Sequence, residues 1–445
     1  MLNSQKLKKV DHKAYFMKSP GICFILLFLI ISTASLAQNA DNFGFYGYFR
    51  SGFGLDGQGG PLDYFKAPNA EAKYRLGNEA EAYIEALFRY ATTDENKARF
   101  ETNLRLAFVT PTSKSNAFVT TTSVREAYVR MTGIHKKRKE LAYWAGQRFY
   151  DRYDAHMIDY WYRDMSGFGG GFEDLVLAKE IKLSAAFLGG SIDQLSSSGS
   201  VYPENEFVFN KVTLDFSLYD IPVALGKSGI TFDWSMFNGD SLVTSQGNYY
   251  IESSNGWSLG LFHEVPFRGG RNRLNLFYGT GAAQNYKAVM EQPMGIVPVA
   301  GIPLEVNNFK RFRVLNDLQV DISEKFSLLG LLLYQNLDNS QSPTNNLNWY
   351  SAGLRPAYHL SRYFSIVGEF GFDYTSQSDA SEGFLLKMTL APQVSPLNKI
   401  LSRPAIRAYF TYAIWSDDFT GLVATTSFPG QNHGLSFGIQ MESWW

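Results

Sequence analysis

Residues 433–445, HGLSFGIQMESWW, constrain the fold more than any other segment of the chain. Every second residue is apolar with one serine as the break, namely Leu435, Phe437, Ile439, Met441 and Trp445. The residues between them are polar or small, except Trp444. Successive side chains of a strand point to opposite faces, so this pattern predicts an amphipathic strand. A soluble sheet would turn the apolar row toward a core, whereas a transmembrane barrel turns it toward lipid and the polar row toward a wet lumen.

The N-terminal segment predicts a secretory signal peptide over residues 1–37. Five lysines precede an apolar run at 22–31, and small residues follow up to Ala37. Ten apolar residues are too few for a membrane-spanning helix, which needs about 20. Cleavage after Ala37 would leave 38–445 as a single barrel domain. The only cysteine, Cys23, would leave with this leader, so neither a disulfide nor a zinc–thiolate site is expected.

Charge gives no indication of a nucleic-acid partner. The chain carries 41 basic and 42 acidic residues, and the leader holds five of the lysines against one aspartate. The remainder is therefore acidic, and it contains no basic patch that would suit a phosphate backbone.

Amphipathic strands recur along the chain. Apolar and polar side chains alternate within 43–53, 79–88, 384–393 and 403–414. If each strand of about 10 residues is followed by a similar length of turn and loop, the chain holds about 18 to 20 strands. Aromatic residues make up 16% of the sequence, which fits the girdles at the two membrane interfaces. We therefore predict an all-β fold, a transmembrane antiparallel β-barrel of about 18 strands that encloses a channel.

Residues 144–171 differ from the other segments and do not favour another strand. Arginine, aspartate and histidine side chains are crowded there among tyrosines and tryptophans, and the segment closes on a glycine cluster suited to tight turns. Burying so many charges in a dry interior would be costly unless they were paired, whereas a water-filled pore removes most of that cost. We expect a pore-constricting loop at about 148–171.

Six motifs resemble the maltoporin family of outer-membrane sugar porins. They are GYFRSGFG (47–54), KYRLGNEAEAYIE (73–85), REA (125–127), WAGQRFYDRYDAHMIDYWYRDMSG (144–167), SRPAIRAYFTYAIW (402–415) and FGIQMESWW (437–445). The motifs follow the family's order and spacing, and the middle of the chain, about 175–345, matches poorly. An aromatic pair at the end of the last strand is also typical of bacterial outer-membrane proteins.

The resemblance implies an 18-stranded, homotrimeric, cofactor-free channel in the lipid of a Gram-negative outer membrane. Such channels pass linear oligosaccharides such as maltodextrins by facilitated diffusion and have no enzymatic activity. The sugar moves along a row of aromatic rings, the greasy slide, between ionic tracks that bond its hydroxyls.

The resemblance also implies roles for particular residues. Slide positions match Tyr48, Tyr83 and Trp444, Trp161 stands where the family has a constricting tyrosine, and Phe118 corresponds to a residue supplied by a neighbouring subunit. The ionic constriction matches Arg50, Arg75, Glu85, Arg125, Arg152, Asp154, His156 and Asp159. Strand alternation independently places the first three aromatic residues on the wet row.

Two departures from the family affect selectivity. Leu401 stands where the family has a slide tryptophan, and Arg271 aligns near a slide phenylalanine. These changes leave the preferred sugar open.

The residues also allow other functions. A general diffusion porin would keep the ionic neck but lack the aligned aromatic residues. An outer-membrane hydrolase would need a nucleophile, and residues 434–438 match G-x-S-x-G, but that motif requires a strand-to-helix turn and here lies within a strand. Asp154, His156 and Asp159 could bind a cation, although nearby arginines are available to pair with the carboxylates. A soluble all-β binding protein would need neither a leader nor the final amphipathic strand.

Overall fold

The computed structural model describes residues 42–110, 121–194, 207–244, 247–288, 301–339, 346–378 and 381–445. Residues 44–445 form one compact unit. The expected signal peptide (1–37) and the expected slide residue Phe118 lie outside the described residues, so both stay predictions.

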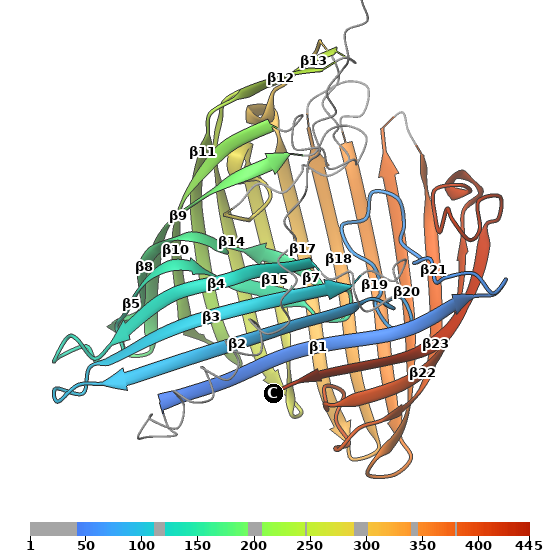
Figure 1. Cartoon of the computed structure of the whole chain (residues 1–445), viewed down its shortest axis with the longest axis horizontal. Helices are drawn as coiled ribbons and strands as arrows, with labels where there is room; N and C mark the ends of the chain where they lie inside the picture. Colours follow the sequence, from blue (N-terminus) through green and yellow to red (C-terminus); the bar gives the residue numbers. More distant parts are fainter. Residues whose placement is uncertain are drawn as a thin grey trace, which may run out of the picture. The chain divides into compact units, whose positions relative to one another are not determined.

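Eighteen strands form a single antiparallel sheet that closes on itself, as the sequence predicted. Its members in wall order are β1 (Phe43–Asp56), β2 (Ala82–Thr93), β3 (Arg99–Thr110), β4 (Thr121–Thr132), β5 (Ala142–Arg148), β8 (Gly167–Ala178), β9 (Ile181–Gln194), β10 (Phe207–Val223), β11 (Gly226–Phe237), β14 (Ser254–Phe267), β15 (Gly270–Thr280), β17 (Lys310–Ser323), β18 (Phe326–Asp338), β19 (Asn346–His359), β20 (Phe364–Gln377), β21 (Glu382–Val394), β22 (Ala405–Trp415) and β23 (His433–Trp444). Pairing of β1 with β23 closes the ring and sets Tyr48 opposite Trp444. In Figure 1 the blue β1 runs beside the dark red β23.

The remaining elements lie between wall strands. They are β6 (Arg152–Ala155), β7 (Tyr160–Asp164), β12 (Asp240–Thr244), β13 (Gly247–Ile251), β16 (Pro303–Leu304) and the short 3-10 helices η2 (Gly281–Ala283), η3 (Val306–Asn308) and η4 (Asp417–Phe419). β6 and β7 form a hairpin separate from the barrel sheet.

Across the described part of the chain, no helix has the length and apolar character needed to cross a bilayer.

The faces of the wall follow the alternation in the sequence. On β22, Phe410 is 50% exposed on the outside, and its neighbour Thr411 is fully buried on the inside. On β23, Ile439 is 60% exposed, whereas Gln440 is 3% exposed. The outer surface is therefore apolar and the inner surface polar, as expected for a barrel in lipid.

The structure corrects the boundaries of the segment predicted at 144–171. β5 carries the wall as far as Arg148, and β8 resumes it at Gly167, so only residues 149–166 leave the sheet. The glycine cluster does not form a turn. Gly170 pairs with Ala145 on β5 and with Phe187 on β9, because glycine also fits an extended strand where neighbouring backbones approach closely. Adding a Cβ at Gly169 would collide with the backbone of β9.

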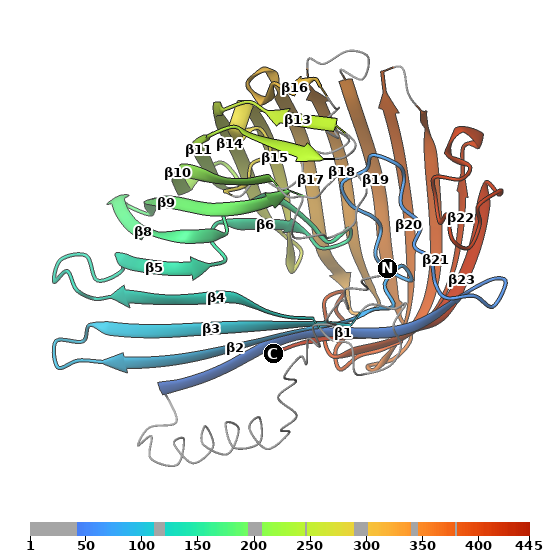
Figure 2. The ribbon, with the colours of Figure 1, turned by 45° about the horizontal axis from the view of Figure 1, so that its top comes forward.

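Residues 57–81, here called the first loop, pack against the inner face of the wall. The ring of Tyr74 lies on Gly353 and Gly371, which are cross-strand partners on β19 and β20, and a Cβ at either glycine would collide with it. The Tyr74 hydroxyl lies 2.8 Å from Ser351 Oγ. The blue segment between β1 and β2 accordingly lies over β19 to β21 in both Figure 1 and Figure 2. The alternating stretch predicted at 79–88 is shorter than expected, because β2 begins at Ala82.

Candidate functional site

The β6–β7 hairpin is tied to the inner wall by one buried arginine. Arg163 is fully buried, and its guanidinium donates to Asp233 on β11 (2.7 Å) and to Asp151 beside the hairpin (2.8 Å). It also bonds to Asp215 on β10. A buried cation is tolerated only when it is paired and hydrogen-bonded, and these three carboxylates supply that pairing. Residues 149–166 are thereby held against the inner wall.

A second buried contact joins the hairpin to the first loop. Glu71 of the first loop bonds to Arg311 and Arg313 on β17, at 2.5 and 3.1 Å, and accepts a hydrogen bond from the hydroxyl of Tyr160 on β7. Burial alone would raise the pKa of the Glu71 carboxyl, but the two guanidiniums and the hydrogen bonds lower it to about 2. The carboxylate therefore stays ionised and links loop, hairpin and wall.

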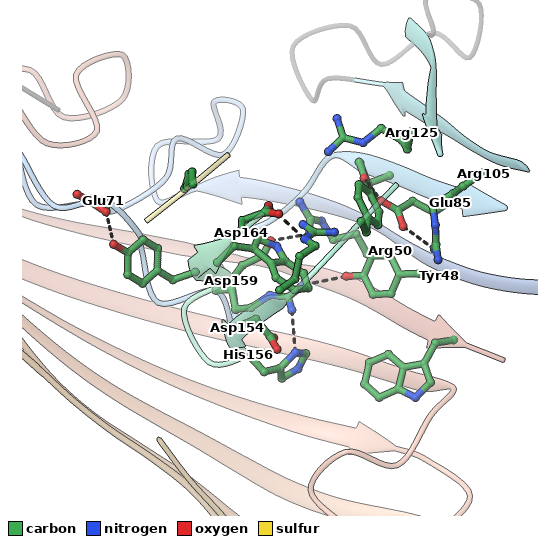
Figure 3. A pocket seen from close by; sticks show the side chains of 18 of the residues that line it. Tyr48, Arg50, Glu71, Glu85, Arg105, Arg125, Asp154, His156, Asp159 and Asp164 are labelled. Carbon is green, nitrogen blue, oxygen red and sulfur yellow. Dashed lines mark hydrogen bonds and ion pairs between the residues drawn. The ribbon is translucent and has the colours of Figure 1, made fainter. Parts of the chain in front are cut away.

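A cavity of about 690 Å³ lies between the hairpin and the inner faces of β1 to β4 and β23, and Figure 3 shows the side chains around it. All twelve predicted site residues that the structure describes line this one cavity. They are Tyr48, Tyr83, Trp161, Trp444, Arg50, Arg75, Glu85, Arg125, Arg152, Asp154, His156 and Asp159.

Three of the predicted aromatic residues form a continuous row. The ring of Tyr48 lies nearly parallel to that of Trp444, with centroids 6.4 Å apart, and is 6.1 Å from the ring of Tyr83. Trp161 stands apart on β7, where the guanidinium of Arg152 lies 3.6 Å from its ring centre. The cavity thus presents a row of three rings and a separate indole.

Ion pairs hold the arginines beside this row. Arg75 bonds to Glu79 at 3.0 Å, to Glu442 at 3.1 Å and to the Tyr48 hydroxyl at 2.9 Å. Arg50 bonds to Glu81 at 2.6 Å and to Asp159 of the hairpin at 3.0 Å. Because each guanidinium is fixed by two carboxylates, its remaining donors point in defined directions.

Glu442 on β23 is the most heavily shared carboxylate of the site. It pairs with Arg75, with Arg407 at 3.3 Å and with Arg403. The guanidinium of Arg403 also lies 4.2 Å from the ring centre of Trp444. One carboxylate therefore positions three guanidiniums, and one of these, that of Arg403, lies over the ring of Trp444.

His156 is held as a neutral ring. Its two ring nitrogens face Arg75 at 3.3 Å and Arg403 at 3.4 Å, and its ring meets Trp444 edge-on. Burial, followed by the charge of Arg75, lowers the pKa of His156 well below its usual value. Two guanidiniums at the ring nitrogens also disfavour a bound cation, and no metal-binding group of three or more His, Cys, Asp or Glu side chains occurs within the described ranges.

Sequence reasoning missed eight residues that line the cavity, namely Glu71, Arg105, Phe149, Tyr160, Asp164, Asn285, Lys287 and Arg311. Strand alternation could have found Arg105, because it shares the inward row of β3 with Asn103 and Ala107. Asn285 and Lys287 lie in the middle of the chain, where the motifs give no guidance.

A closed 18-stranded barrel with an apolar outer face and a charged, aromatic-lined interior defines an outer-membrane porin. The model of the LamB porin family matches residues 43–445. The chain belongs to that family, which places it in the outer membrane of a Gram-negative bacterium as a channel rather than an enzyme.

Several solved structures align with most of the chain at low identity. OccK3 (OpdO) of Pseudomonas aeruginosa aligns at 9% identity and a TM-score of 0.47, over 92% of this chain and 97% of that one. OmpF of Salmonella typhi, in complex with daunomycin, aligns at 11% identity and a TM-score of 0.45, over 90% and 98%. OmpT of Vibrio cholerae aligns at 9% identity and a TM-score of 0.40, over 91% and 97%. The family assignment rests on the sequence match alone.

Proposed function

We propose that this porin passes linear oligosaccharides of the maltodextrin type by facilitated diffusion. In this proposal the segment 149–166 narrows the pore, the rings of Tyr48, Tyr83, Trp444 and Trp161 form a slide, and the fixed arginines and carboxylates form hydrogen-bonding tracks. The observation that carries it is the continuous row of three rings beside fixed guanidiniums in a single cavity.

The chemistry of a sugar suits such a cavity. A pyranose has apolar C–H patches that lie on aromatic faces, and hydroxyls that accept bonds from arginine and donate to carboxylates. Stacking on rings is weakly directional and permits sliding, whereas the charge-assisted bonds are directional and set the register. Transport requires binding that admits the sugar and still releases it, and millimolar affinity, about −4 kcal/mol, meets both needs.

Three further parts of the proposal come from the family resemblance. The chain is exported by the leader at 1–37, it assembles as a homotrimer, and Phe118 reaches the pore of a neighbouring subunit. Matching motifs at both ends of the expected mature chain support these parts.

One observation favours a general diffusion porin as the second candidate. Guanidiniums already lie on two of the predicted slide rings, Arg152 on Trp161 at 3.6 Å and Arg403 on Trp444 at 4.2 Å. A sugar would have to stack on the opposite faces of these rings, or displace the guanidiniums.

Planar-bilayer conductance of the refolded protein, titrated with maltodextrins of increasing length, separates the two candidates. A selective slide gives saturable block that weakens at least threefold in Tyr48→Ala and Trp161→Ala. Tyr358→Ala, at an exposed tyrosine of β19, serves as a matched control and should leave the block unchanged. A steady ohmic current that no sugar blocks would instead establish general diffusion, and no conductance at all would refute a channel.

A further inference from the structure

Three guanidiniums gather around a single phenylalanine in the cavity. Phe149 directly follows β5, and the guanidinium carbons of Arg152, Arg105 and Arg125 lie 3.9, 5.2 and 5.4 Å from its ring centre. Arg152 comes from the hairpin, Arg105 from β3 and Arg125 from β4. Figure 3 shows Arg105 and Arg125 at one end of the cavity. Like charges repel, so such a gathering needs either nearby carboxylates or an external anion.

Carboxylates satisfy only one of the three arginines fully. Arg105 bonds to Glu126 at 2.5 Å and to Glu85 at 3.0 Å. Among the described residues, Arg152 pairs only with Asp164, whose oxygen lies 3.1 Å from Nε. The geometry of this contact is not that of a hydrogen bond, so the buried Nε has no acceptor within the described part of the chain.

Arg125 has no carboxylate partner within the described part of the chain. Its side chain is exposed and lines the cavity, and its guanidinium lies over the ring of Phe149. Two guanidiniums with unused donors therefore lie within 5.4 Å of one ring centre.

Unused guanidinium donors select for a particular acceptor. The planar fork of arginine matches the two oxygens of a carboxylate or a sulfate and binds them with two parallel hydrogen bonds. A neutral sugar hydroxyl offers one oxygen and no charge, so it would leave the repulsion between the two arginines unrelieved. An anionic group beside Phe149 would offer charged acceptors to the unused donors of Arg125 and Arg152.

We propose that, among linear oligosaccharides, this channel prefers those that bear anionic groups, carboxylate or sulfate, and that Arg125 and Arg152 bind those groups. This proposal rests on the proposed function and specifies its substrate class. Asp154 lines the same cavity and has no ion pair among the residues described. Its carboxylate would repel a bound anionic group and so limit how tightly the acidic sugar is held. Affinity is thus strong enough to select the acidic sugar and weak enough to release it.

The test compares two linear α-1,4-linked hexamers, galacturonate hexamer and maltohexaose, as blockers of single-channel current in 0.1 M KCl. The acidic hexamer should block at a concentration about tenfold lower, a difference of about 1.4 kcal/mol. Arg125→Gln should remove most of this preference, because it weakens the block by the acidic hexamer by a much larger factor than the block by maltohexaose. Arg362→Gln, at an exposed arginine of the β19–β20 turn, removes the same charge far from the cavity and should change neither.

Two further measurements use the same assay. Asp154→Asn should tighten the block by the acidic hexamer, because it removes the opposing charge. Raising KCl to 1 M should weaken that block about tenfold and leave maltohexaose unchanged, because screening acts on the charged sugar only.

The outcomes separate this proposal from the proposed function. Equal block by the two hexamers, or stronger block by maltohexaose, overturns the acidic substrate and leaves a sugar channel. A preference that survives in Arg125→Gln overturns the assigned site. Absence of block by either hexamer overturns the sugar channel and the acidic substrate with it.

Discussion

Replacing Glu442 by glutamine tests the ionic arrangement of the cavity most directly. The side chain is 3% exposed and pairs with Arg75, Arg403 and Arg407, whose side chains are 5%, 2% and 5% exposed. The substitution keeps the shape of the side chain, since an amide replaces a carboxylate. It removes the only negative charge that the three arginines share.

The structure indicates how large the loss should be. An ion pair at 3.1 Å has a Coulomb energy of about 5 kcal/mol at an effective dielectric constant of about 20, before desolvation is subtracted. Arg75 keeps Glu79, and Arg407 keeps the oxygen of Gln393 at 2.6 Å. Arg403 has no second carboxylate among the described residues. Within the described ranges, Arg403 and Arg407 are both left without a carboxylate, but each keeps a neutral acceptor, the backbone oxygen of Ser402 and the amide oxygen of Gln393. Since removing one partner of a buried pair costs about 3–5 kcal/mol, we expect a loss at the lower end of that range, about 3 kcal/mol.

The assay is unfolding of the protein by guanidinium chloride in lipid vesicles, followed by tryptophan fluorescence. Glu382→Gln serves as a control, because that glutamate is exposed at the start of β21 and, among the described residues, its side chain has a single hydrogen bond, from Tyr374 at 3.3 Å. The control should change the free energy of unfolding by less than 0.5 kcal/mol. If Glu442→Gln also lowered the free energy of unfolding by less than about 1 kcal/mol, water or a counter-ion would be replacing the carboxylate. The conclusion that Glu442 stabilises the three arginines would then be wrong.

Three other predictions concern single contacts. Glu71→Gln should lower the free energy of unfolding by about 3 kcal/mol above pH 4.5, and by progressively less as the pH falls toward 2. The reason is that the depressed pKa of Glu71 stabilises the fold only where an unfolded glutamate is ionised. Unfolding measured from pH 2 to pH 6 checks this. Sugar block should stay constant from pH 5 to pH 8 because His156 remains neutral, and an inflection near pH 6.5 would contradict that. Gly371→Val should displace Tyr74, lower the free energy of unfolding by about 1–3 kcal/mol and speed proteolysis of the first loop. Gly368→Val should be tolerated, because its Cβ would make only ordinary van der Waals contacts, 3.5 Å from Phe370 and Pro356.

The wall could be predicted from sequence because its signal is local. Alternation such as Phe410 and Thr411 needs only neighbouring residues, and it gave the correct faces of β22 and β23. The alternation cannot be read where the residues are glycines. Residues 167–171 are rich in glycine, which marks neither face, so a wall strand was mistaken for part of a loop.

The site could be predicted in part, for a different reason. The family motifs named residues that do line one cavity, because those motifs surround it. Contacts between distant segments stayed hidden, since Glu71 meets Arg311 only after the barrel has brought the first loop to β17. The surface on which Tyr74 packs depends on the register that pairs Gly353 with Gly371. The sequence of a single strand does not determine that register.

The pairing of β1 with β23 makes sealing of the wall and assembly of the cavity one event. At this seam Tyr48 lies opposite Trp444, and Arg50 lies opposite Glu442. A barrel that has not yet joined these strands lacks a sealed wall, the stacked rings and the central carboxylate at once. An immature barrel would therefore leak without discrimination, and the cell's exposure to such leakage depends on how quickly this one seam closes.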